Sequence, residues 1–145
     1  MAEPRTSLYL AQLFEATLPQ LQALAAIVSA HALRHATRPV PAQLLSDAEA
    51  ILIACRRVLG REPVAARLAL GVPPDWAELD AKLALALAGF RSFRARFYGF
   101  DAEAGLAAWR LTTRPARVAP PSPNTMARRA IAQLERQIDR LEKDI

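Results

Sequence analysis

The most regular pattern of apolar positions along the chain lies between residues 75 and 100. Its apolar residues recur at alternating steps of three and four, which places them on one stripe of an α-helix and would scatter them over both faces of a strand. The stripe comprises Trp76, Leu79, Leu83, Ala86, Phe90, Phe93, Phe97 and Phe100. Asp75 and Glu78 have the spacing of a capping box, and Gly99 suits the left-handed position that ends a helix. The sequence therefore predicts one long helix over residues 75–98.

The preceding half of the chain predicts three further helical segments. From about residue 6 an apolar stripe continues through Leu10, Phe14, Leu18, Leu21, Leu24 or Ala25, and Val28. Pro19 interrupts this segment without changing the phase of the pattern, so we expect a kinked helix or two closely abutted helices. Residues 42–59 form the next helix, with a stripe of Leu45, Ala48, Leu52, Cys55 and Leu59. A short helix is expected over residues 62–70, with Pro63 in its first turn.

The pattern changes twice after residue 100. Asp101 is a good N-cap, so a brief helix is expected from there to about residue 111. Residues 112–124 have no apolar period and are rich in proline, which indicates a linker. Residues 125–145 return to the helical rhythm, with Ile131, Ile138 and Ile145 alternating with Leu134 and Leu141 in the manner of a coiled coil. A helix of this length is marginal alone in water and needs a partner surface.

Composition agrees with a helical fold. The chain has 145 residues, of which 52% are apolar, and these proportions suit one compact body with an extension. Alanine and leucine, the best helix formers, dominate over β-branched residues. The predicted fold class is all-α: a bundle of about four or five helices over residues 6–111 within a first unit 1–111, then the linker 112–124 and a separate amphipathic helix 125–145.

The positive charge is concentrated near the C-terminus. The net charge is +5, and no acidic residue occurs between Glu103 and Glu135. Five arginines fall in that window: Arg110, Arg114, Arg117, Arg128 and Arg129. Such a stretch is either a solvated linker or a surface that contacts phosphates or an anionic membrane surface.

Candidate reactive groups are few. His31 and His35 are four residues apart on one predicted helix, a spacing that lets two imidazoles share a metal ion, but the glutamate of the metalloprotease motif is missing between them. The cluster of Asp75, Glu78 and Asp80 is explained by helix capping. We therefore predict no catalytic residue, no metal site and no cofactor.

Cys55 is the single cysteine of the chain, so no intramolecular disulfide can form. Its place between Leu52 and Leu59 on an apolar stripe predicts a core residue whose thiol is hard to ionise. A reducing, cytoplasmic environment fits this cysteine usage. The longest apolar run, 24–33, is too short to span a bilayer, and residues near the start do not fit a signal peptide, so no membrane association is predicted.

Arginines also flank the apolar stripe of the long helix. Arg91, Arg94 and Arg96 alternate with phenylalanines along the sequence, but on a helix the two sets separate into a core face and charged shoulders. If this stripe were open to a partner, the arginines would steer that partner.

These observations lead to two alternative functions. The first is a non-enzymatic interaction or oligomerisation module, in which Ile131, Leu134, Ile138 and Leu141 bind another helical protein or a second copy of the chain. The alternative is sequence-tolerant nucleic-acid binding through the five arginines of the basic window, which would weaken steeply with salt. The hypothesis of a helical enzyme depends on His31 and His35 alone, and no small-molecule substrate is identified.

Overall fold

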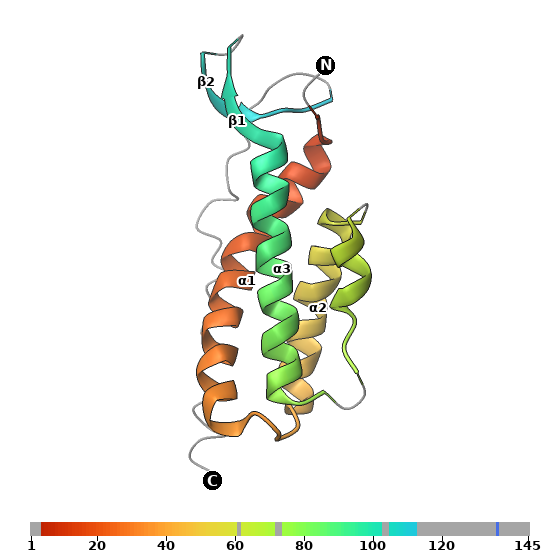
Figure 1. Ribbon diagram of the computed structural model, residues 1–145, viewed down its shortest axis with the longest axis vertical. Helices are drawn as coiled ribbons and strands as arrows, with labels where there is room; N and C mark the ends of the chain where they lie inside the picture. The colour runs from red at the N-terminus through yellow and green to blue at the C-terminus, as the bar shows by residue number, and fades with distance from the viewer. Residues whose placement is uncertain (1–3, 61, 72–73, 103–104, 113–135, 137–145) are drawn as a thin grey trace.

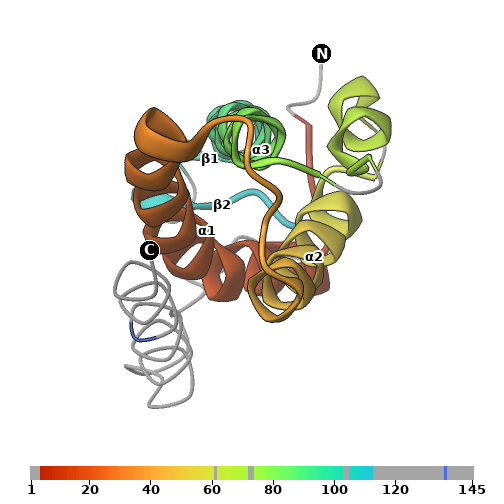
Figure 2. The ribbon, with the colours of Figure 1, turned by 90° about the horizontal axis from the view of Figure 1, so that it is seen from below.

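The computed structural model describes residues 4–60, 62–71, 74–102, 105–112 and 136, and the structural statements below refer to these residues. They form three α-helices, one 3-10 helix and a two-stranded hairpin, so the broadly all-α prediction is confirmed. The helices are α1 (Leu8–His35), α2 (Ala42–Val58), η1 (Pro63–Leu68) and α3 (Trp76–Phe97), and the strands are β1 (Tyr98–Asp101) and β2 (Leu106–Trp109). Seen along their length, α1, α2 and α3 stand around a common core (Figure 2).

Helix α1 is continuous through Pro19, so the alternative of two abutted helices is wrong. Its first part crosses α3 obliquely and its second part runs beside α3 (Figure 1). The Ser7 hydroxyl caps it by accepting the amide N–H of Leu10 at 3.1 Å. The buried residues are Ala11, Phe14, Thr17, Leu21, Leu24, Val28 and His31. Leu10 and Leu18, which we placed on the core stripe, are only partly buried.

Helices α2 and η1 complete the core on the other side. The buried residues of α2 are Leu44, Ala48, Ile51, Leu52, Cys55 and Val58. The predicted helix over 62–70 is a six-residue 3-10 helix that packs on α2 and α3. Gly89 of α3 permits this contact, because a Cβ there would lie 2.7 Å from Leu59 Cδ1 and 3.2 Å from Val64 Cγ1.

Helix α3 is the central element, and six of its eight predicted stripe residues are buried: Trp76, Leu79, Leu83, Ala86, Phe90 and Phe93. The Asp75 carboxylate caps the helix by accepting the N–H of Glu78 at 2.8 Å. The second half of the predicted capping box is wrong. The Glu78 carboxylate instead accepts the N–H of Gly71 at 2.6 Å and so fastens the preceding segment to the helix.

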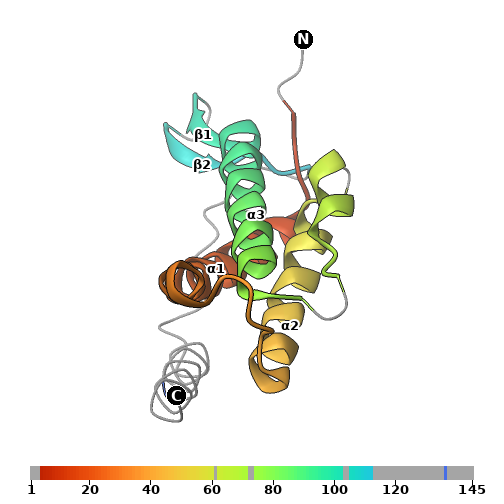
Figure 3. The same cartoon turned by 60° about the horizontal axis from the view of Figure 1, so that its bottom comes forward.

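The chain after α3 forms a hairpin, so the predicted helix over 101–111 is wrong. Strands β1 and β2 pair antiparallel, with Phe100 opposite Ala107, at the end of α3 (Figure 3). Gly99 is therefore part of a strand, and Gly105, at φ 70°, is the one described residue with positive φ. Phe100 leaves the helical stripe for the strand and is 68% exposed.

Trp109 explains why the hairpin replaces a helix. Its ring lies 5.1 Å from the Phe14 ring and 5.9 Å from the Phe93 ring, and its Nε1 donates to the Glu15 carboxylate at 3.1 Å. The segment after Trp109 is fixed by the hydrogen bond from the Thr112 N–H to the Thr6 carbonyl oxygen, at 2.9 Å. Burial of this large aromatic side chain outweighs the local preference of an alanine-rich segment for helix.

Candidate functional site

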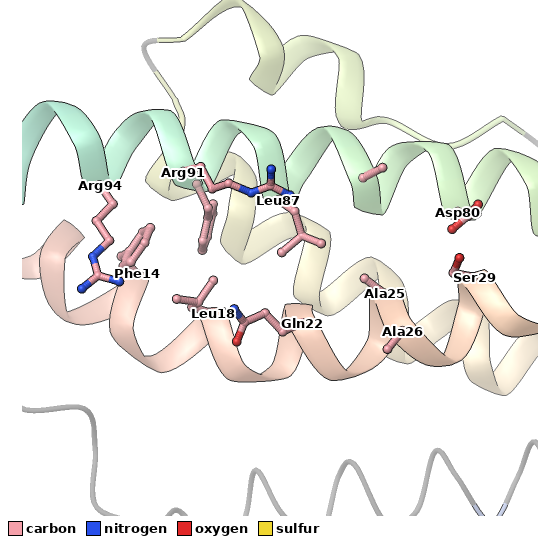
Figure 4. A pocket seen from close by; sticks show the side chains of 12 residues that line it. Phe14, Leu18, Gln22, Ala25, Ala26, Ser29, Asp80, Leu87, Arg91 and Arg94 are labelled. Atoms are coloured by element: carbon pink, nitrogen blue, oxygen red, sulfur yellow. The ribbon is translucent and has the colours of Figure 1, made fainter.

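A groove with a cavity volume of about 500 Å³ runs between α1 and α3 on the side away from α2 (Figure 4). Each helix contributes a stripe of exposed and partly buried side chains together with one buried phenylalanine, Phe14 of α1 and Phe90 of α3. The stripe of α1 comprises Phe14, Leu18, Gln22, Ala25, Ala26 and Ser29, and that of α3 comprises Asp80, Ala84, Leu87, Phe90, Arg91 and Arg94. We call this feature the α1–α3 groove.

Small side chains create the α1–α3 groove. Ala25, Ala26 and Ser29 of α1 and Ala84 of α3 line the groove, so the two helices leave a channel that longer side chains would fill. Leu18 and Leu87 are partly buried and form apolar walls toward the middle of the channel. The sequence analysis missed the groove, because alanine, serine and glutamine at helical spacing give no apolar signal. Leu18 gave no signal either, because in the sequence it fits the apolar stripe assigned to the core.

The two ends of the α1–α3 groove carry opposite charge. Arg91 and Arg94 stand at the end near Phe14, whereas Asp80 stands opposite Ser29 at the other end (Figure 4). Both arginines are exposed, as predicted for shoulders of the apolar stripe, and the Arg94 guanidinium lies 4.7 Å from the Tyr98 ring centroid. The groove therefore has an apolar floor, a positive end and a negative end.

The arginines and apolar residues predicted to bind partners are mostly outside the described residues. Arg110 is described, and its guanidinium donates to the carbonyl oxygen of Arg96 at 2.7 Å. Arg114, Arg117, Arg128 and Arg129 lie outside the described residues, and so do Ile131, Leu134, Ile138 and Leu141. Arg136 is the one described residue of the predicted C-terminal helix, and it is helical and exposed.

The histidine pair is built into the packing of α1 and α3. His31 is buried and stacks on Trp76, with ring centroids 5.0 Å apart, while the His31 and His35 rings are 6.4 Å apart. The described residues contain no group of three or more histidine, cysteine, aspartate or glutamate side chains that could hold a metal ion. This arrangement gives His31 a packing role between the two helices.

Cys55 is a core residue, as predicted. Its side chain is fully buried in α2, and this burial raises the pKa of the thiol from 9.0 to about 12. The thiolate is the reactive form of cysteine, so this residue is unreactive at neutral pH.

Helix α1 is long and apolar enough to cross a membrane by length and composition, and 28% of its most apolar window is buried within the described structure. Core helices of water-soluble proteins and signal sequences meet the same criterion, so the cytoplasmic location stays a prediction.

Comparison with known proteins gives no match: no family model, no curated protein and no solved structure is similar to this chain.

Proposed function

We propose that this chain is a self-association module, in which residues 125–145 of one copy dock as an amphipathic helix in the α1–α3 groove of a second copy. The proposed module has three segments: the body 1–111, the linker 112–124 and the C-terminal helix. Two copies that exchange these helices would form a closed symmetric dimer, in which both grooves are filled.

The lengths of the two surfaces support the proposal. The lining of the α1–α3 groove extends from Phe14 to Ser29, which at 1.5 Å per residue is about 22 Å. The apolar row from Ile131 to Ile145 would extend about 21 Å as a helix. One row of isoleucine and leucine side chains thus matches one channel floored by alanine.

The single observation that carries the proposal is the charge beside the two apolar surfaces. With isoleucine at the a positions and leucine at the d positions of a heptad, the flanking e and g positions include Glu135, Glu142 and Asp144. In a parallel pair of such helices Glu135 and Glu142 would lie opposite Ala130 and Gln137, so neither carboxylate would face a cation. The α1–α3 groove instead offers Arg91 and Arg94 beside its floor. The arginine-flanked groove is therefore the better partner for this helix than another copy of the helix.

The charges also predict the direction of docking. Arg128 stands at an e position near the start of the segment, and the flanking acids follow it. When the helix runs antiparallel to α1, Arg128 approaches Asp80 and the flanking acids approach Arg91 and Arg94. The reverse direction would bring like charges together at both ends.

A second copy, rather than the same chain, is the occupant we propose. The α1–α3 groove is open, and its lining comes from α1 and α3 alone among the described residues.

Nucleic-acid binding, the alternative function, stays a prediction. Of its five arginines Arg110 is described, and its guanidinium is committed to the backbone at the end of α3.

The proposal is tested by the solution mass of the full chain, measured by sedimentation equilibrium over a range of concentrations. We expect a dimer for the unchanged protein. We expect a monomer for Leu134→Glu/Ile138→Glu, because each of these side chains contributes on the order of 1.5–3 kcal/mol when buried.

A matched pair of variants tests the groove itself. Ala84 lines the groove and Ala81 does not, yet both are exposed alanines of α3. Ala84→Glu places a charge in the apolar floor and should weaken dimerisation at least tenfold, whereas Ala81→Glu should leave it unchanged. A dimer that survives Ala84→Glu as well as Ala81→Glu would contradict docking in the groove.

A further inference from the structure

A second cavity, of about 590 Å³, is lined by residues from the start of α1 and from the ends of α2 and α3. Its apolar wall comes from five side chains: Pro4, Leu10, Val58, Phe93 and Phe97. Its volume is within the range of small-molecule sites. We call it the end cavity.

Three arginines from three different segments line the end cavity, and one glutamate opposes them. Arg5 precedes α1, Arg57 lies in the last turn of α2, and Arg96 lies in the last turn of α3. The amino end of α1, with Ser7 in the lining, adds partial positive charge, while the carboxyl ends of α2 and α3 carry the opposite partial charge. The lining as a whole is cationic.

The three arginines differ in what they already bind. Arg96 forms an ion pair with Glu62, and Arg5 Nη1 donates to the carbonyl oxygen of Leu111 at 2.9 Å. Arg57 is exposed, and its side chain forms no hydrogen bond or ion pair within the described part of the chain. One guanidinium group is thus available at the rim of an apolar cavity.

We infer that the end cavity binds a small amphipathic carboxylate, with its head group on Arg57 and its apolar chain along Phe93 and Phe97. A guanidinium holds a carboxylate through two parallel hydrogen bonds, and a single available arginine matches a single negative charge. This inference is independent of the proposed function, because the α1–α3 groove and the end cavity share neither Arg57 nor any other arginine.

The test is a titration of the ¹⁵N-labelled full chain with octanoate, followed by amide chemical shifts. Octan-1-ol has the same chain without the charge, and butyrate has the charge without the chain. We expect saturable shifts around Val58, Phe93 and Phe97 with octanoate, and at least tenfold weaker binding of each control. Arg57→Gln should weaken octanoate binding about tenfold, as expected for loss of a charge-assisted pair.

Arg56→Gln is the matched control variant, because Arg56 is the exposed neighbour of Arg57 and does not line the end cavity. It should bind octanoate as the unchanged protein does. The inference is overturned if octanoate causes no saturable shift at these residues, if octan-1-ol binds equally well, or if the two arginine variants behave alike. Both arginines are exposed, so neither substitution should disturb the fold. The amide spectrum of each variant without octanoate checks this.

Discussion

Helix α3 carries two stripes of side chains that have the same spacing and different surroundings. One stripe, with Leu79, Leu83 and Ala86, is buried against α1 and α2. The other, with Ala84, Leu87 and Arg91, lines the α1–α3 groove and faces solvent. Helical periodicity places residues on a face, but side-chain volume decides whether that face closes. Large apolar residues fill the space between helices, and alanine leaves a channel.

The largest expected effect is a difference in the free energy of unfolding between substitutions in the two stripes. Leu83→Ala removes a fully buried side chain and should lower the free energy of unfolding by about 2–5 kcal/mol. Ala84→Glu changes the neighbouring, exposed position and should alter stability by less than about 0.5 kcal/mol while it weakens dimerisation. Urea denaturation of both variants at low protein concentration checks this contrast. Equal losses of stability would show that the groove stripe is part of the core.

A smaller effect concerns the buried stripe of α2, where Cys55 makes the stability of the protein depend on pH. The pKa of its thiol is raised by burial from 9.0 to about 12 in the folded protein. Between these two pH values the unfolded chain loses the thiol proton and the folded protein keeps it. The free energy of unfolding therefore keeps the full contribution of the protonated thiol below pH 9. It decreases as the pH rises, by about 1.4 kcal/mol at pH 10.

The control for this pH effect is Cys55→Ala, which removes the titrating group and keeps the other ionisable residues. The free energies of unfolding of the two proteins should diverge above pH 9. Curves that stay parallel up to pH 11 would mean that the thiol ionises in the folded state as easily as in the unfolded chain.

The sequence predicted the helices well where large apolar residues recur without interruption. The stripe from Trp76 to Phe93 and the core position of Cys55 follow directly from the 3.6-residue period. The prediction failed after Phe97, because the packing of Trp109 against Phe14 joins residues far apart in the chain. Local capping signals at Asp101 and Gly99 carry no information about that contact.

The candidate sites were harder to predict than the fold. The α1–α3 groove is defined by what small side chains leave empty, and the end cavity by three arginines from separate segments. Neither feature has a fixed sequence spacing. Leu134 and Ile138 were predicted from sequence as partner-binding residues because their side chains are large and periodic, but the surface proposed to receive them was visible only in three dimensions.

The central claim is exchange of C-terminal helices between copies in a defined direction, and disulfide cross-linking tests it most directly. In the proposed direction residue 130 lies near Ser29, so Ser29→Cys/Ala130→Cys should form a covalent dimer on mild oxidation. Ser29→Cys/Asp144→Cys tests the opposite direction and should remain uncross-linked. Buried Cys55, with its pKa raised to about 12, does not compete for oxidation. A disulfide within one chain, or a covalent dimer from the second pair alone, would contradict the account.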